Sequence, residues 1–216
     1  MSQISLRLLR IERRNIPAGT SLLVLLFLFT FVSQQVFGTD QVIAKLGFWP
    51  GKFFTGHGNQ PMGTEFTRLF SYAFVHLDVV HLALNIFGMA YFGVLTERIT
   101  GTSSFLAIFM ISALVSALVF GSFHFFIFEL EQVSLIGASG SISALVGVAA
   151  YRRKFFPVIM WLVAEAAIIA GSILTSQPVG YFAHFGGFAA GVCLAMLIVQ
   201  RKQQQLSFNR KVISES

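Results

Sequence analysis

Residues 136–151 read IGASGSISALVGVAAY, an uncharged run of small, apolar and hydroxyl-bearing residues. On a helix, with 100° between successive residues, Ser139, Ser143 and Gly147 fall on one side, within about 80° of one another. A stripe of small side chains lets a second helix approach closely where no water drives packing. This stretch therefore predicts a buried helix that begins with serine hydroxyls and packs against a partner helix.

The composition indicates a polytopic membrane protein. Hydrophobic residues make up 55% of the 216 residues and charged residues 11%, and the mean hydropathy of +0.75 is far above that of a soluble domain. A helix needs about 20 residues to cross roughly 30 Å of hydrocarbon. Six stretches approach that length: 20–37, 76–95, 103–123, 136–151, 155–174 and 181–199. The predicted fold is an all-α membrane bundle of six transmembrane helices.

The fourth of these stretches, 136–151, is short for a full span. It lies between the acidic Glu131 and the basic Arg152. We therefore expect Ser139, near its start, to lie below the membrane surface, at the floor of a loop that dips inward.

Basic residues predict the orientation of the bundle. With the N-terminus inside, all but three of the 15 Lys and Arg residues fall on the cytoplasmic side, the exceptions being Lys45, Lys52 and Arg68. The positive-inside rule then places both termini in the cytoplasm. We expect cytoplasmic tails at 1–19 and 201–216 around a membrane domain at 20–200. The net charge of +6 follows from this asymmetry, and no basic stripe interleaved with aromatic residues indicates nucleic-acid binding.

The sixth stretch carries a histidine in register with glycines. His184, Gly187 and Gly191 share one face of a helix, with the imidazole at the outer end of the stripe. Packing this stripe against the stripe of the fourth stretch would bring the Ser139 hydroxyl within hydrogen-bond reach of His184, as a base-activated nucleophile requires. A histidine within a membrane can also bind a metal or a backbone carbonyl, and small stripes also serve packing alone.

A third polar group lies on the second stretch. His81 and Asn85 share a face near its outer end, beneath His76 and Asp78. An Asn amide can donate to an oxyanion without titrating. Two alternatives stay open: a metal site formed by His76, Asp78 and His81, although these lack the spacing of a His-Glu-x-x-His motif, or a polar cap at the helix end.

Taken in chain order on the second, fourth and sixth stretches, these motifs resemble those of the rhomboid intramembrane serine proteases. The resemblance extends from about residue 66 to 199 and rests on the segments Gly137-Ala138-Ser139-Gly140 and Ala183-His184-Phe185-Gly186-Gly187. It includes Arg68, similar to the Arg of a Trp-Arg loop motif, and the turn Glu97-Arg98 followed by Gly101-Thr102.

The resemblance implies a compact six-helix bundle and a serine-histidine dyad without an acidic third member. Ser139 would be the nucleophile, His184 the base, and His81, Asn85 and the main-chain N–H of Ser139 the oxyanion donors. The supporting residues would be His76, Gly137, Gly140, Gly187 and Gly191. The resemblance implies no cofactor and no metal. It also implies substrates that are single-pass or other membrane proteins, cut within the lipid bilayer, and a location in a bacterial inner membrane with the site open to the outer side.

The chain departs from the family pattern at two positions. Thr67 stands where a Trp precedes the Arg, and Ser143 stands where an aromatic residue, four after the nucleophile, supports the histidine ring. Ser143 could instead hold the ring through a hydrogen bond. An alternative function is therefore a weak or inactive rhomboid-like protein that binds transmembrane helices without cutting them. Glu165, in the middle of the fifth stretch, is expected to be protonated and bonded to its own helix.

Overall fold

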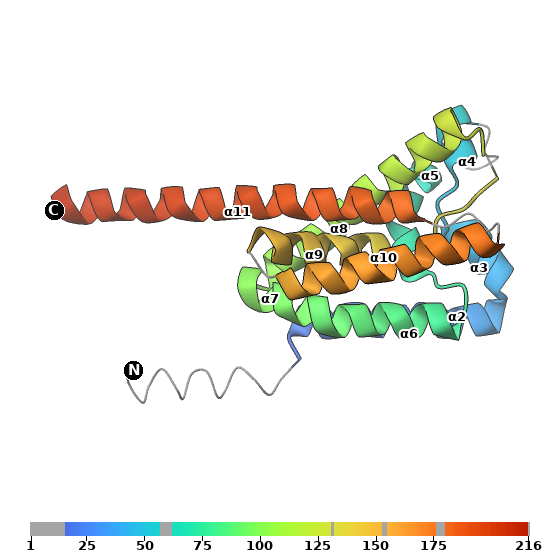
Figure 1. Ribbon diagram of the computed structural model, residues 1–216, viewed down its shortest axis with the longest axis horizontal. Coiled ribbons are helices and arrows are strands. Elements are labelled where there is room, and N and C mark those ends of the chain that lie inside the picture. The colour runs from blue at the N-terminus through green and yellow to red at the C-terminus, as the bar shows by residue number, and fades with distance from the viewer. Residues whose placement is uncertain (1–15, 57–61, 131, 153–154, 176–179, 216) are drawn as a thin grey trace.

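The computed structural model is a bundle of helices (Figure 1), and it describes residues 16–56, 62–130, 132–152, 155–175 and 180–215. In chain order the elements are α2 (Ala18–Phe37), α3 (Thr39–Leu46), α4 (Pro50–Thr55), α5 (Met62–Ser71), the 3₁₀ turn η1 (Tyr72–Phe74), α6 (Val79–Gly88), η2 (Met89–Gly93), α7 (Val94–Thr100), α8 (Thr102–Ser122), η3 (Phe123–Ile127), α9 (Ser139–Tyr151), α10 (Phe155–Thr175) and α11 (Tyr181–Glu215). The chain is all-helical over this part, apart from one isolated β-bridge between Phe48 and Leu135.

Four helical segments of the described chain are long and apolar enough to cross a membrane. They are Ala18–Phe37, Val79–Thr100, Thr102–Ile127 and Tyr181–Ile198. The two other apolar helices, Ser139–Tyr151 and Phe155–Gly171, are shorter. The predicted stretches coincide with these helices to within about five residues at either end. The second helix begins at Val79 and the fourth at Ser139, so 76–78 and 136–138 belong to the preceding connections.

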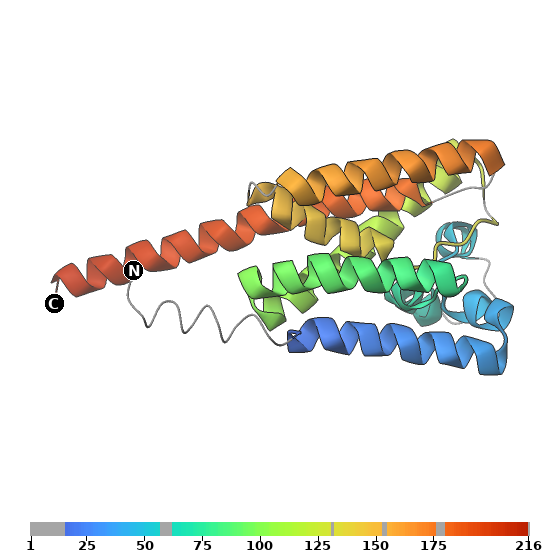
Figure 2. The same ribbon diagram turned by 60° about the horizontal axis from the view of Figure 1, so that its bottom comes forward.

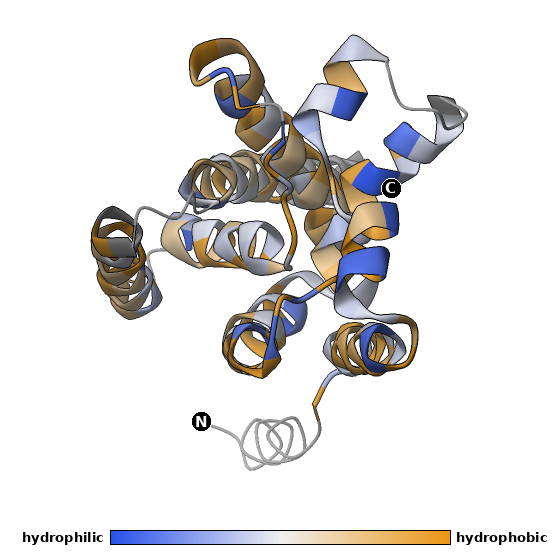
Figure 3. Cartoon of the chain, turned by 90° about the vertical axis from the view of Figure 1, so that its right-hand side faces the viewer, coloured by the Kyte–Doolittle hydropathy of each residue, from blue (hydrophilic) through white to orange (hydrophobic). Residues whose placement is uncertain are grey.

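The outside of the bundle is apolar, as a lipid-facing surface requires. Phe29, Val32 and Val80 are each at least 60% exposed, and the end-on view of Figure 3 shows hydrophobic residues on the outer as well as the inner sides of the helices. The interior holds a continuous aromatic and aliphatic core that includes Phe27 and Phe109. Large apolar side chains on an outer surface are favourable against lipid and unfavourable against water. This exposure pattern therefore favours a membrane protein over a soluble one.

The described residues of the segment 38–75 form the three short helices α3, α4 and α5, which gather at the end of the bundle opposite the far end of α11 (Figure 2). The Phe48–Leu135 bridge, with N···O distances of 3.1 and 2.8 Å, joins this segment to the loop before α9.

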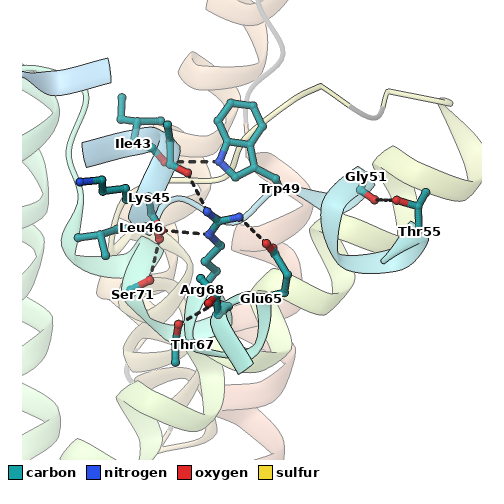
Figure 4. Close-up of polar contacts among 12 residues, drawn as sticks. Ile43, Lys45, Leu46, Trp49, Gly51, Thr55, Glu65, Thr67, Arg68 and Ser71 are labelled. Atoms are coloured by element: carbon teal, nitrogen blue, oxygen red, sulfur yellow. Dashed lines mark hydrogen bonds and ion pairs between the residues drawn. The ribbon is translucent and has the colours of Figure 1, made fainter. Parts of the chain in front are cut away.

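Arg68 fastens α5 to the end of α3 (Figure 4). Its guanidinium donates to the carbonyls of Lys45 at 3.0 Å and Ala44 at 2.9 Å and forms an ion pair with Glu65 at 2.6 Å. Both charged side chains are buried. A guanidinium can hold three acceptors at once because its donors form a planar fork.

Glu97 connects the start of α2 to the end of the second span. Its carboxylate accepts hydrogen bonds from the N–H groups of Gly19 and Thr20, the Thr20 hydroxyl and the Thr102 hydroxyl, all at 2.7–2.8 Å. The first N–H groups of a helix lack partners within the helix. Here the carboxylate of Glu97, from another helix, is the partner of two of these N–H groups. Its negative charge lies at the positive end of the helix dipole.

The residues for which a tail at 201–216 was expected are helical up to Glu215. α11 continues without interruption to Glu215, well beyond the bundle (Figure 1). The stretch after Gly191 contains neither Gly nor Pro and is rich in Gln, Lys and Arg, which are good helix formers. The expected tail at 1–19 lies largely outside the described residues.

Candidate active site

The first residue of α9 contacts a histidine on α11. The Ser139 hydroxyl lies 2.7 Å from Nε2 of His184, and the imidazole is 6% exposed. The two residues are 45 positions apart and come together because their helices cross closely at this point. A serine hydroxyl that donates to an imidazole nitrogen is the arrangement from which the nitrogen can take the proton.

Glycines allow that crossing. A Cβ atom at Gly187 would clash with the carbonyl oxygen of Gly140, and one at Gly191 would clash with the carbonyl oxygen of Ala144. Likewise, a Cβ at Gly147 would clash with the carbonyl of Phe188. Backbone therefore packs directly on backbone, as small residues permit between membrane helices.

The packing face of α9 is rotated from the one expected. Gly140, Ala144 and Gly147 lie against α11, whereas Ser139 and Ser143 border a groove next to α10. The expectation that Ser139, Ser143 and Gly147 would form the packing stripe was wrong for Ser143. The sequence could not discriminate these faces because small residues occur on both.

Glu165 of α10 contacts the other nitrogen of the imidazole. Its two carboxyl oxygens lie 2.9 and 3.0 Å from Nδ1 of His184, and its side chain is buried. The expectation that this carboxyl group would bond to its own helix was wrong, because its partner lies on α11. Glu165, His184 and Ser139 thus form a continuous chain of hydrogen bonds across three helices.

Ser143 does not hold the imidazole ring. Its hydroxyl donates to the carbonyl of Ser139 at 2.9 Å and accepts from Nε1 of Trp161 at 2.9 Å, while both ring nitrogens of His184 have other partners. Trp161 lies one helical turn before Glu165, and its ring stacks on Phe188 with centroids 4.6 Å apart. α10 is therefore attached to the site through two side chains on one face.

The α6 helix presents two of the predicted donors. Asp78 is its N-cap, and the Asp78 carboxylate accepts from the N–H of His81 at 2.8 Å, so the expected polar cap is present. Asn85 is buried, donates one amide hydrogen to the carbonyl of His81 at 2.8 Å, and lines the same groove as Ser139 and His184. The second amide hydrogen of such a group can serve another acceptor.

Gly137 makes the turn that leads into α9. Its φ of +100° is one that side-chain-bearing residues rarely adopt, and its N–H donates to the carbonyl of Tyr72 at 2.9 Å. A Cβ at this position would lie 2.5 Å from Nε2 of His81. Glycine thus allows both the turn and the close approach of the His81 ring to the loop before Ser139.

His76 lies in the connection before α6, outside the apolar span that begins at Val79. The side-chain amide of Gln34 bonds to the main chain of His76. It accepts from the His76 N–H at 3.1 Å and donates to the His76 carbonyl at 2.7 Å. Burial, reinforced by the neighbouring His81, lowers the pKa of His76 to about 3. Its ring packs against His81, with centroids 5.3 Å apart. His76 therefore contributes packing behind His81.

A groove of about 200 Å³ lies in front of the serine. The elements α6, η2, α9, α10 and α11 contribute to its wall, which is mainly apolar and includes Phe87, Phe92 and Met160. The polar groups that face it are few, among them Ser139, Asn85 and His184. An apolar groove with a few convergent polar groups suits an apolar ligand that must be oriented at one point.

The metal alternative receives no geometric support from this arrangement. Asp78 is engaged as a helix cap, and Nδ1 of His81 accepts from the N–H of Leu77 at 3.3 Å. Within the described ranges, no group of three His, Cys, Asp or Glu side chains is arranged to hold an ion.

Comparison with known proteins identifies the family. A model of the rhomboid domain matches residues 63–201, which is more than half of the chain. The protein belongs to the rhomboid family. The match begins within α5 and includes every predicted site residue, from His76 to Gly191.

Two curated rhomboid relatives are similar over much of the chain. A RHOMBOID-like protein 6, mitochondrial, from Arabidopsis thaliana is 27% identical over 150 residues, covering 65% of this chain and 46% of the relative. The rhomboid protease GlpG of Klebsiella pneumoniae is 24% identical over 193 residues, covering 86% of this chain and 64% of the relative. The chain thus spans about half to two thirds of the length of these relatives.

Sequence reasoning missed the partners of Glu165 and Trp161. An ionisable group within an apolar stretch is a functional candidate by default, and Trp161 precedes it by one helical turn on the same face. This pattern could have marked Glu165 and Trp161 as functional candidates. Their partners could not be predicted, because neither helix periodicity nor the family pattern indicates which neighbouring helix a side chain meets.

Proposed function

We infer that this rhomboid-family protein is an intramembrane serine endopeptidase in which Ser139 is the nucleophile and His184 the general base. The observation that carries the inference is the 2.7 Å contact between the Ser139 hydroxyl and Nε2 of His184. The name of the GlpG relative, a rhomboid protease, supports the same activity.

The chemistry follows from these two groups. Ser139 attacks the carbonyl carbon of the scissile bond while its proton passes to Nε2 of His184, which then gives the proton to the leaving amine. Water hydrolyses the resulting ester with His184 again acting as base. The negatively charged oxygen that forms in each step would be stabilised by the Asn85 amide, the His81 ring and the N–H of Ser139, the last at the positive end of α9.

The substrates would be transmembrane segments of other membrane proteins. The mainly apolar wall of the groove suits such a segment. A helical peptide bond must leave its helix before its carbonyl can be attacked, so small or helix-breaking residues near the cleavage site should favour cutting. Neither step needs a cofactor.

The proposed arrangement has six spans, with both termini in the cytoplasm of a bacterial cell and the site open toward the outer side of the inner membrane. The distribution of Lys and Arg supports this orientation. Single cysteines at positions 45 and 210 in a Cys193→Ala background, labelled in intact cells with a reagent that cannot cross the membrane, test it. Labelling at 45 alone is the expected result.

The nucleophile is tested with a fluorophosphonate probe on purified protein in detergent. Wild type should react and Ser139→Ala should not. Ser139→Ala and His184→Ala should each abolish cleavage of a transmembrane substrate, and the double variant should be no worse than either, because residues that act as a unit are not additive. Equal labelling of wild type and Ser139→Ala would contradict the proposal.

A second candidate is a protein that binds transmembrane helices without cutting them. Ser143, in place of the aromatic support of the family, is the observation that favours it. This candidate predicts that Ser139→Ala captures the same membrane proteins as wild type and that wild type releases no fragments from them.

A further inference from the structure

Glu165 is a buried carboxyl group for which the dyad described above has no role. It is 4% exposed, and its side chain lines the same apolar groove as Ser139. Both of its oxygens lie within 3.0 Å of one atom, Nδ1 of His184. Burying a carboxyl group is unfavourable unless its partners compensate, so its position needs an explanation.

The contact has a defined chemical consequence. An ionised Glu165 can only accept a hydrogen bond, and Nδ1 of His184 would then carry the proton of this contact. The neutral imidazole has one proton, which leaves Nε2 as an acceptor toward the Ser139 hydroxyl. When Nε2 takes the serine proton, the ring becomes positively charged beside the carboxylate, which stabilises that charge.

A purely structural role explains the arrangement less well. Trp161 already attaches α10 to α9 through Ser143, and an apolar side chain at 165 would pack against α11 without the cost of burying a carboxyl group. Glu97 shows what a structural carboxylate looks like in this protein: its oxygens accept four hydrogen bonds at a helix start. The oxygens of Glu165 are directed instead at a single ring nitrogen.

The departure at Ser143 points the same way. An aromatic side chain at that position would support one face of the histidine ring, and this chain has a serine bonded to Trp161. The hydrogen bond from Nδ1 fixes the ring orientation from its edge. In this chain the imidazole is therefore held by a contact from α10, where the family pattern has an aromatic contact from α9.

We propose that Glu165 is a positioning residue that fixes the orientation and tautomer of His184 and stabilises its protonated form, so that the hydrolytic site works as Glu165–His184–Ser139. The proposal rests on the proposed function. It makes α10 part of the reaction machinery, and the proton taken from Ser139 stays on the imidazole rather than passing to the carboxylate.

The test compares kcat and KM for a transmembrane substrate, together with the thermal midpoint in detergent, in four variants. Glu165→Gln keeps the shape and removes the charge, and Glu165→Leu removes both polar functions. Glu165→Asp keeps the charge on a shorter stem. Glu97→Gln is the matched control, because it neutralises another buried carboxylate that lies away from the groove.

Glu165→Gln should lose about 10²–10⁴-fold in kcat with little change in KM, because an amide can hold the wrong tautomer. Glu165→Leu should lose a similar factor while melting at or above the wild-type temperature, and Glu165→Asp should recover part of the activity. Glu97→Gln should melt at a lower temperature but keep its kcat per folded molecule.

Two results would overturn the proposal, and they are distinguishable. If Glu165→Leu retains kcat within about threefold of wild type, Glu165 does not act through His184, while Ser139-dependent cleavage by wild type would leave the proposed function intact. If wild type shows no cleavage that depends on Ser139, the proposed function and the role of Glu165 both fail. If Glu165→Gln does not fold, the kcat values of Glu165→Leu and Glu165→Asp decide between these outcomes.

Discussion

At the scale of single residues, Ser139, His184 and Glu165 contact one another although each lies on a different helix. Ser139 and His184 could be paired from the sequence because each stands in register with small residues. Glu165 could not be paired with His184, since the neighbour that it meets depends on how α10 rotates about its own axis, which a helix apolar on nearly all sides does not reveal.

Asn85 is expected to act on the rate more than on substrate binding. Removing one donor to an oxyanion typically costs about 10²–10³ in kcat. Because His81 and the N–H of Ser139 remain, Asn85→Ala should reduce kcat by about tenfold to a hundredfold, with much less change in KM. Steady-state kinetics on a transmembrane substrate measure this.

Replacement by a carboxylate gives the control for that variant. Asn85→Asp should be at least as damaging as Asn85→Ala, because a negative charge repels the oxyanion. An active Asn85→Asp beside an inactive Asn85→Ala would indicate a metal held with His76, Asp78 and His81 instead, and addition of a chelator would then abolish activity.

His76 should make the folded protein sensitive to acid. Its pKa is about 3 when folded and about 6.5 when unfolded, so the unfolded chain binds a proton first as the pH falls. Its contribution to stability is therefore complete above about pH 6.5 and is lost progressively below it, by about 2 kcal/mol between pH 7 and pH 5.

His76→Phe keeps a ring in the same place and removes this titration. The Gln34 contacts use only the main chain of residue 76, so they survive the substitution. The fall in thermal midpoint between pH 7 and pH 5 should be smaller in His76→Phe than in wild type. An identical fall in both proteins would show that other groups carry the acid sensitivity.

At the scale of elements, the crossing of α9 and α11 sets the distance between the serine and the histidine. The sequence predicted that these two helices meet, because stripes of small residues mark both. It did not predict that α9 begins at Ser139 or which of its faces meets α11, because helix ends depend on tertiary contacts such as the Phe48–Leu135 bridge.

Gly191→Ala should separate the two helices although it adds a single methyl group. The new Cβ would clash with the carbonyl of Ala144, and a displacement of about 1 Å at a reacting pair can cost about 10²-fold. The rate of fluorophosphonate labelling should fall accordingly, while membrane insertion is unchanged because it depends on hydropathy.

Gly171→Ala is the matched substitution on α10. A Cβ there would meet no atom within 4 Å, so labelling should proceed at the wild-type rate. Equal labelling of Gly191→Ala and wild type would show that the close approach at Gly191 does not control the site.

At the scale of the whole molecule, the helices α3–α5 form a structured end to the bundle. Composition alone indicated a membrane protein, but the segment 38–75 lacked the long apolar periodicity from which helices are recognised. Its helices are short and depend on contacts such as those of Arg68.

Arg68→Ala should destabilise the whole fold. It leaves Glu65 buried without its partner and frees two carbonyls of α3. Breaking a buried ion pair from one side costs about 3–5 kcal/mol, so the thermal midpoint should fall markedly. The double variant Arg68→Leu with Glu65→Leu should recover part of the loss. A double variant less stable than either single one would contradict this account.

The order in which the site residues occur along the chain has a consequence during synthesis. Ser139 is made 45 residues before His184, and Glu165 lies between them. By contrast, the Glu97 contact with α2 can close as soon as the second span is complete. A growing chain can therefore assemble its first hairpin early, but the hydroxyl of Ser139 lacks its partner His184 until the last span has left the ribosome. A stalled or truncated product that lacks α11 would therefore lack the base of the proposed Ser139–His184 dyad.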